Sequence, residues 1–168
     1  DYGKLREKLL AEGQILEHDA PLAGGRGTSP RKLPGIVVDN EQAVSTGSWT
    51  ESGSAEAFVG FGYFHDGNAN KGRASALFQT KIEKAGSYTV RLAYPPNNNR
   101  ASNVPVEVTH GGGVEKILVN QKKAPSDGLF ETLGTFDFPV GEASVKVSNT
   151  GTDGYVILDA VQWLPAEE

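Results

Sequence analysis

The sequence predicts an all-β fold: an antiparallel β-sandwich of the jelly-roll type with nine or ten strands, preceded by a short N-terminal helix and an extended arm. From Ile36 onward, short runs alternate between apolar and polar residues, which is the period of a strand with one buried and one solvated face. Turn residues separate these runs every 8–14 positions, and the 21 glycines are typical of a chain with many turns. No stretch within this region has the length and period of a helix.

The start of the chain has a different character. Residues 1–17 are predicted to form an amphipathic helix, because apolar side chains recur there at helical spacing. Residues 18–35 contain three prolines and four glycines without a period, which predicts a linker or an extended arm. We therefore place a boundary near Gly35 and divide the chain into residues 1–35 and a β-sandwich module over residues 36–168.

The individual strands follow from the alternation. Between residues 86 and 94, for example, Tyr88, Val90, Leu92 and Tyr94 share one face. A set of strands of this number and pattern is that of a jelly roll or a related β-sandwich. The predicted strands are Ile36–Asp39, Thr46–Glu51, Ala57–Phe64, Ser75–Ile82, Gly86–Tyr94, Val104–His110, Val114–Val119, Phe130–Phe138, Ala143–Ser148 and Val156–Leu164.

Composition and charge exclude several function classes. The net charge of −5 provides no basic stripe for nucleic acid and argues against an anionic membrane surface. No apolar run approaches the roughly 18 residues that a membrane span needs. The absence of cysteine excludes disulfides, thiolate metal sites and a cysteine nucleophile. Because the chain has no methionine and begins at Asp1, we expect it to be a fragment or a processed product of a longer protein.

Catalysis is not expected in this chain. Its three histidines are His18, His65 and His110, and His18 lies in the linker. No G-x-S-x-G nucleophile elbow accompanies them, and no two carboxylates stand out as a glycosidase pair. No G-x-G-x-x-G follows a strand and opens a helix, so no site for FAD is expected here.

A first candidate binding site is the run from Tyr63 to Asp66. In a functional interpretation, Tyr63 stacks on a sugar while His65 and Asp66 form hydrogen bonds to it. In a structural interpretation, Tyr63 fills the core, and His65 and Asp66 tie down the loop at residues 66–72. The structural interpretation is preferred.

A second candidate lies between Tyr94 and Asn103. Asn97 and Asn103 supply amides for sugar hydroxyls, and Arg100 is able to hold a uronate carboxylate in a bidentate fork. Asparagine and proline are also common turn formers, and an arginine paired with a buried acid is equally ordinary. Both interpretations stay open. This loop is nevertheless the best place to look for a binding surface, because sandwich-end loops often carry function.

The two tryptophans offer a similar choice. Trp49 follows a Thr-Gly-Ser turn and Trp163 lies in the last predicted strand, and either ring has the shape to stack on a sugar. Because aromatic residues in strands belong to the core more often than to a binding platform, a core position is predicted for both.

Asp39 and Asp159 are candidates for a structural calcium site. They lie on the first and last strands of the module, which are often neighbours in carbohydrate-binding sandwiches, and Ca²⁺ takes oxygen ligands. The alternative is that each acid caps a loop or pairs with a basic side chain.

Sequence stretches spread along the module resemble a known family. The run from Ile36 to Leu164 is similar to the golvesin-type, xanthan-lyase carbohydrate-binding-domain-like module. The segment from Leu5 to Leu16 is similar to the one that precedes this module in bacterial FAD-dependent oxidoreductases named as xanthan lyases. The matching stretches include Val38-Asp39-Asn40, Thr46-Gly47-Ser48-Trp49, Tyr63-Phe64-His65-Asp66, Ala85-Gly86-Ser87-Tyr88-Thr89-Val90, Asn103-Val104-Pro105-Val106 and Gly151-Thr152-Asp153-Gly154-Tyr155-Val156.

The resemblance implies a non-catalytic carbohydrate-binding-like module of a larger exported bacterial enzyme, which it would target to a polysaccharide outside the cell or in the periplasm. FAD would belong only to the parent protein. The alternative is a structural or interaction domain that packs against its parent FAD-dependent oxidoreductase or mediates oligomerisation, with no glycan ligand.

Overall fold

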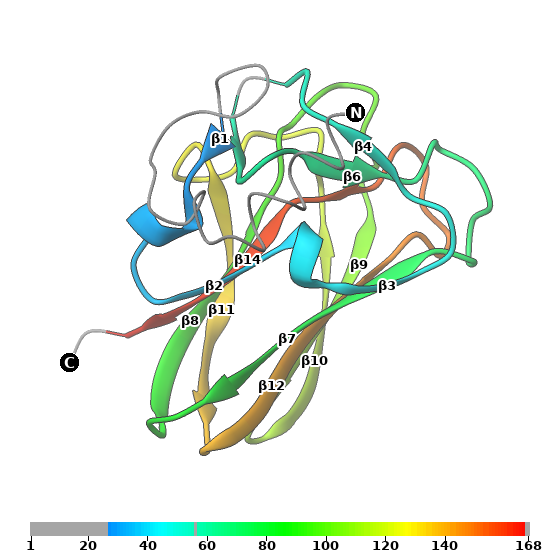
Figure 1. Ribbon diagram of the computed structural model, residues 1–168. Coiled ribbons are helices and arrows are strands. Elements are labelled where there is room, and N and C mark those ends of the chain that lie inside the picture. Colours follow the sequence, from blue (N-terminus) through cyan, green and yellow to red (C-terminus); the bar gives the residue numbers. More distant parts are fainter. Residues whose placement is uncertain (1–26, 56, 167–168) are drawn as a thin grey trace.

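Two antiparallel sheets packed face to face form the body of the molecule (Figure 1). The computed structural model describes residues 27–55 and 57–166. The five-stranded sheet has the order β10-β9-β12-β7-β3, and the four-stranded sheet has the order β11-β8-β14-β2. The first sheet consists of β3 (Val44–Thr46), β7 (Ser75–Ile82), β9 (Val104–His110), β10 (Gly113–Val119) and β12 (Gly141–Ser148). The second consists of β2 (Ile36–Asp39), β8 (Gly86–Ala93), β11 (Phe130–Phe138) and β14 (Ala160–Pro165).

Shorter elements complete the fold around one end of the sandwich. A three-stranded sheet has the order β13-β6-β4, formed by β4 (Thr50–Ser52), β6 (Tyr63–His65) and β13 (Ile157–Leu158). β1 (Gly27–Thr28) pairs in parallel with β5 (Phe58–Val59). Two 3-10 helices, η2 (Pro30–Lys32) and η3 (Asn40–Gln42), flank β2. Among the described residues, no helix is long and apolar enough to cross a membrane.

The predicted all-β sandwich is confirmed, and β2, β7, β9 and β11 have the predicted bounds. The strand number differs, because the runs at 46–51, 57–64 and 156–164 each contribute to two short strands, and β1 brings the described total to 14. Gly47 and Gly60 cause two of these breaks, since their φ values of 88° and 74° lie in the left-handed region, where a strand does not continue.

The described part of the arm lies against the sandwich. The predicted helix at residues 1–17 and the arm as far as residue 26 lie outside the described residues. From residue 27 onward, Leu33 packs on a small apolar cluster on the outer face of the four-stranded sheet, and Gln162 Nε2 donates a hydrogen bond of 2.8 Å to the Pro34 carbonyl. That cluster consists of Val59, Ala93, Phe130 and Ala160.

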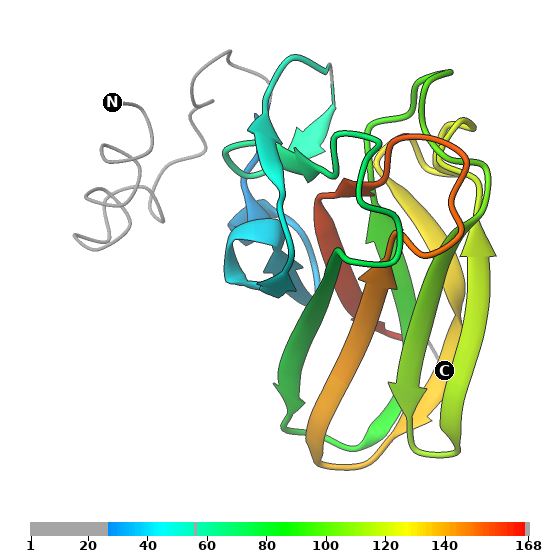
Figure 2. The same ribbon diagram turned by 90° about the vertical axis from the view of Figure 1, so that its right-hand side faces the viewer.

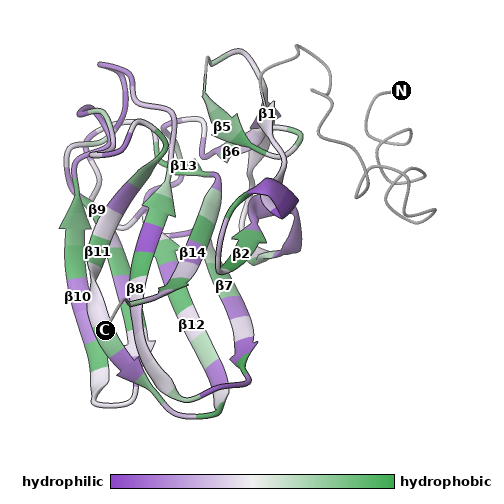
Figure 3. Ribbon diagram, turned by 90° about the vertical axis from the view of Figure 1, so that its left-hand side faces the viewer, coloured by the Kyte–Doolittle hydropathy of each residue, from purple (hydrophilic) through white to green (hydrophobic). Residues whose placement is uncertain are grey.

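The main core lies between the two sheets and follows the predicted alternation. Figure 3 shows this alternation as green and purple bands along β8. Trp163 is fully buried, as predicted, whereas Trp49 is half-buried with its Nε1 donating to the Thr46 carbonyl at 3.1 Å. The buried set includes Tyr88, Val90 and Leu92 of β8, Val104, Val106 and Val108 of β9, and Phe78 and Ile82 of β7.

The long loops meet at one end of the sandwich. Loops 66–74, 95–103 and 149–156 lie at the end that carries the three-stranded sheet (Figure 2). The opposite end has short turns, among them the hairpin at Gly111 and Gly112 between β9 and β10. Polar side chains that are distant in sequence therefore come together at the loop end.

The position of the core can be tested with two leucines. Leu92 is fully buried and Leu118 is 70% exposed. We expect Leu92→Ala to lower the free energy of unfolding by about 2–5 kcal/mol, through lost burial and a cavity, and Leu118→Ala to change it by no more than about 0.5 kcal/mol. Urea unfolding measures both changes. Equal effects of the two substitutions would contradict the assignment of β8 to the core.

Candidate functional site

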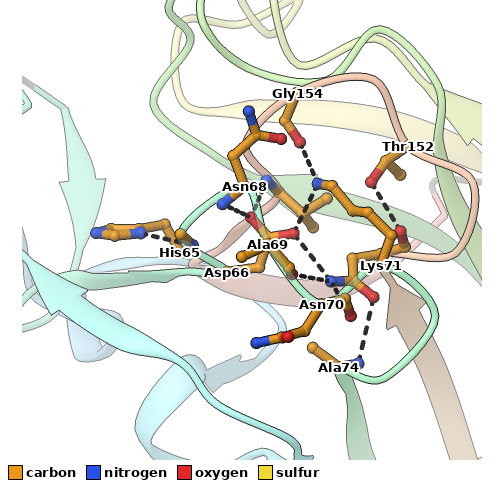
Figure 4. A network of polar contacts seen from close by, with 12 residues as sticks. His65, Asp66, Asn68, Ala69, Asn70, Lys71, Ala74, Thr152 and Gly154 are labelled. Carbon is orange, nitrogen blue, oxygen red and sulfur yellow. Dashed lines mark hydrogen bonds and ion pairs between the residues drawn. The ribbon is translucent and has the colours of Figure 1, made fainter.

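The carboxylate of Asp66 lies at the centre of the loop end (Figure 4). Its Oδ1 accepts hydrogen bonds from the backbone N–H groups of Asn68 and Val156, at 2.9 and 3.0 Å. Its Oδ2 accepts from Lys71 Nζ at 2.9 Å and from Asn149 Nδ2 at 3.0 Å. Burial by itself would raise the pKa of Asp66, but these four bonds outweigh burial and lower that pKa below its usual value.

Asn149 and Lys71 extend this network across two loops. Asn149 Oδ1 accepts from the N–H groups of Gly72 and Ala74, at 2.9 and 3.2 Å. Lys71 Nζ also donates to the Gly154 carbonyl at 2.6 Å. Loops 66–74 and 149–156 are thus tied to each other by buried and partly buried polar contacts, for which little water competes.

The loop at residues 95–103 is tied to the same assembly. Asn103 Oδ1 accepts from Asp153 N at 3.1 Å, and its Nδ2 donates to the Gly151 carbonyl at 3.0 Å. The N–H and hydroxyl of Ser102 donate to the Asp153 carboxylate, and these bonds lower the pKa of Asp153. Asn103, a predicted ligand residue, therefore has both ends of its amide engaged within the protein.

Arg100 is buried and contributes to the internal structure of this loop. Its Nε donates to the Pro95 carbonyl at 3.1 Å, and its Nη1 donates to Asn99 Oδ1 at 3.0 Å. Its guanidinium carbon lies 5.8 Å from the centroid of the Tyr63 ring, within cation–π range. In the described part of the chain its partners are a carbonyl, an amide and a ring, rather than the buried acid that the sequence offered as one alternative.

Two predicted tyrosines are also buried. Tyr63 is 3% exposed, and its hydroxyl lies 3.3 and 3.5 Å from the hydroxyls of Ser52 and Ser54. Tyr94 donates its hydroxyl proton toward the carbonyl of Lys123 at 2.9 Å. Burial, and then the charge of Glu131, raise the pKa of Tyr94 to about 12. These contacts agree with the structural interpretation, and ligand binding by these residues stays a prediction.

The accessible residues lie beside this network. Asn97, Asn98 and Asn99 are exposed, while His65 and Tyr155 are half-buried with ring centroids 5.6 Å apart. We call these five residues the loop surface. Tyr155 was not among the predicted site residues. It directly follows the Gly-Thr-Asp-Gly turn, and an aromatic residue beside a loop is a candidate for ligand contact that the sequence could have supplied.

His65 presents a defined hydrogen-bonding group on the loop surface. Burial lowers its pKa, and so does the charge of Arg100, against an opposing contribution from Asp66. The imidazole is therefore neutral at pH 7. Its Nδ1 accepts from Gly67 N at 3.0 Å, so that the proton resides on Nε2. Because no hydrogen bond between described residues uses Nε2, this N–H is available to a ligand hydroxyl.

β2 and β14 are neighbouring strands, as predicted, with Asp39 paired in register with Ala160, and Asp159 directly precedes β14. Asp159 is fully buried, and both of its carboxylate oxygens accept from Val59 N at 3.0–3.1 Å. Asp39 caps η3 by accepting from Glu41 N at 3.2 Å. Burial, followed by the charge of Asp39, raises the pKa of Asp159 well above its usual value.

The described residues contain no group of three or more histidine, cysteine, aspartate or glutamate side chains that could hold a metal ion. Asp39 and Asp159 supply two carboxylates, so any calcium there would need further oxygen ligands. Calcium at this pair stays a prediction of the sequence.

Known proteins match the same part of the chain. A profile of the Golvesin C-terminal domain matches residues 36–164. A xanthan lyase of Bacillus sp. (strain GL1) is 35% identical over 140 residues, which are 79% of this chain and 15% of that protein. The structure of a Paenibacillus xanthan lyase, also 35% identical, matches with a TM-score of 0.74 over 79% of this chain and 13% of that one. The resemblance of residues 36–164 to the golvesin-type, xanthan-lyase module is confirmed, and the chain spans only a small part of these relatives.

Two more distant structures share the fold. A GH26-CBM35 β-(1,4)-mannanase of Podospora anserina is 14% identical, with a TM-score of 0.59 over 79% of this chain and 28% of that one. An exo-β-1,3-galactanase of Phanerochaete chrysosporium is 20% identical, with a TM-score of 0.52 over 78% of this chain and 29% of that one. At these identities the likeness concerns the fold alone.

The network around Asp66 can be tested by removing its charge. We expect Asp66→Asn to lower the free energy of unfolding by about 2–4 kcal/mol, because two donors then face the new NH₂ group. Asp137→Asn is the control, since Asp137 is exposed, and it should cost no more than about 0.5 kcal/mol.

The Asp66 network should also make stability depend on pH. The folded-state pKa of Asp66 is lowered, so the contribution of this carboxylate to the free energy of unfolding is present above about pH 3.8 and is lost as the pH falls through the folded-state pKa. Chemical unfolding at several pH values measures both effects, and equal losses in the two variants would disprove the network's role.

Asp159 should show the opposite pH dependence. Its folded-state pKa is raised, so its contribution to stability is full below about pH 3.8 and is lost as the pH rises toward that folded-state value. Since Asp159→Asn removes this titration, we expect the stability of the variant relative to wild type to increase as the pH rises above about 3.8. Thermal unfolding between pH 4 and pH 8 measures the difference. A relative decrease, together with a lower Tm in excess EDTA, would contradict this expectation and support calcium at the pair.

Proposed function

Because the chain belongs to the Golvesin C-terminal domain family, we propose that its sandwich is a non-catalytic carbohydrate-binding module of a longer, exported bacterial enzyme. The module acts by adsorption: it holds its catalytic partner close to a polysaccharide and carries out no turnover itself. The observation that carries this proposal is the loop surface, where partly accessible aromatic rings lie beside exposed amides on a rigid support.

The loop surface has the chemistry that a sugar ring requires. Tyr155 presents part of an aromatic face, on which the apolar C–H side of a pyranose is able to stack. His65 Nε2 donates to a hydroxyl, and the exposed side-chain amides of Asn97 and Asn98 both donate and accept. The Asp66 network keeps the surrounding loops in place, so little conformational entropy is lost on binding.

The parent enzyme and its location belong to the same proposal. The relatives that match at 35% identity are named as xanthan lyases. We infer a polysaccharide-degrading parent that works outside the cytoplasm, and these names favour a lyase over an FAD-dependent oxidoreductase. The substrate of the parent is then a polysaccharide to which this module adheres.

A second candidate function is that of an interaction domain without a glycan ligand. β10 is an edge strand of the five-stranded sheet, and its outward side chains Val114 and Leu118 are 56% and 70% exposed. Such an edge is suited to packing against a parent domain or a second copy of the chain.

Affinity electrophoresis tests the proposal. Gels are cast with xanthan and with a panel of neutral and acidic polysaccharides. We expect retardation by at least one of them, and we expect Tyr155→Ala to weaken binding by about fivefold or more, because truncating an aromatic residue at the centre of a contact costs more than about 1 kcal/mol. The matched control is Phe136→Ala, since Phe136 stacks on His110 with a centroid distance of 4.6 Å at the opposite end of the sandwich.

Two results would count against glycan binding by the loop surface. If no polysaccharide retards the protein, the interaction-domain alternative gains support. If Phe136→Ala and Tyr155→Ala weaken binding equally, the loop surface is not the contact. Thermal unfolding of both variants checks that they remain folded.

A further inference from the structure

The outer face of the five-stranded sheet carries a hollow of about 560 Å³. Its lining residues place it toward the loop end of this sheet, where β7 begins and β12 ends. Figure 2 shows loops 66–74 and 149–156 above this part of the sheet. Its lining includes residues of β7, β9, β10 and β12. The loop surface contributes none of these residues, so the hollow is a separate feature of the same end of the molecule.

Basic side chains predominate among the charges of the hollow. The sheet register places Glu107 of β9 between Lys146 of β12 and Lys116 of β10. Arg73 adds a third cation at the edge of the loop at residues 66–74. Three cations against one carboxylate make the hollow a basic site on a chain whose net charge is −5.

Glu107 lies opposite both lysines in the sheet register, but no ion pair or hydrogen bond between described residues holds these cations. The hydrogen bonds and ion pairs between described residues do not involve the side chain of Arg73, Lys116 or Lys146. All three residues are exposed. Two ammonium groups and a guanidinium are therefore available to an external anion at little cost in broken contacts.

We propose that this hollow is a second glycan site, which binds a stretch of polysaccharide bearing carboxylate groups. Lys116, Lys146 and Arg73 pair with the carboxylates, and the hydroxyls of Ser75 and Ser148 bond the sugar hydroxyls. Pro105 and Leu118 offer apolar surface to the C–H side of the ring. This inference rests on the proposed function and adds to it a separate site and a chemical class of ligand.

A carboxylated glycan fits the hollow better than other anions do. A nucleic acid would find no aromatic ring in the lining on which a base could stack. The hydroxyl-bearing residues of the lining, which also include Thr46 and Thr150, match a ligand rich in hydroxyl groups.

The test compares charged polysaccharides with their uncharged derivatives. Affinity electrophoresis is run with polygalacturonate, alginate and hyaluronate, each in its native and its fully methyl-esterified form. We expect stronger retention by the native forms, and weaker retention as the salt concentration rises. Lys116→Gln and Lys146→Gln should each lower affinity for the native forms by about two- to fivefold, as expected for exposed ion pairs. Lys81→Gln is the control, since Lys81 is an exposed lysine of β7 outside the hollow.

The outcomes separate this inference from the proposed function. Equal retention by native and esterified forms, or unchanged binding by Lys116→Gln and Lys146→Gln, overturns the charged site and leaves glycan binding intact. If a gel cast with poly-L-glutamate retains the protein as strongly as the native polysaccharides do, the assignment to a glycan is overturned and the ligand is an acidic peptide instead. If no polysaccharide retains the protein, the proposed function fails and the second site fails with it.

Discussion

The buried carboxylate of Asp66 is the contact on which the loop end of the sandwich depends. It joins Lys71 of its own loop to Asn149, a residue 83 positions away in the sequence. A carboxylate with four hydrogen-bond donors around it stabilises loops that have little apolar surface of their own. The sandwich core holds the strands together, and the Asp66 network determines where the loops between them lie.

This arrangement separates the residues that support the loop end from those that a ligand can reach. Asp66, Arg100 and Asn103 have the chemistry of sugar ligands, but their polar atoms bond other parts of the protein. Their neighbours, including His65 and Tyr155, remain accessible. The basic hollow on the five-stranded sheet borders loops 66–74 and 149–156, which the Asp66 network joins. Loss of the Asp66 network would therefore disturb both surfaces together.

Local patterns predicted the strands better than the site. β7 and β9 alternate regularly, so a period of two was sufficient to give their bounds. The strand interruptions at Gly47 and Gly60 depend on left-handed backbone conformations that composition alone does not reveal. Asn149 could not be recognised, because its partners lie 75–83 positions away and hydrogen bonds of that range leave no local pattern.

The central claim is that the module binds a glycan at its loop end. Hydrogen–deuterium exchange of the intact chain, with and without the polysaccharide that retards it most, tests this claim most directly, because amide exchange reports protection along the whole backbone. We expect slower exchange in loops 66–74, 95–103 and 149–156, and no change in the turn at residues 110–113 at the opposite end. Unchanged exchange in all three loops, or protection confined to that turn, would contradict the account.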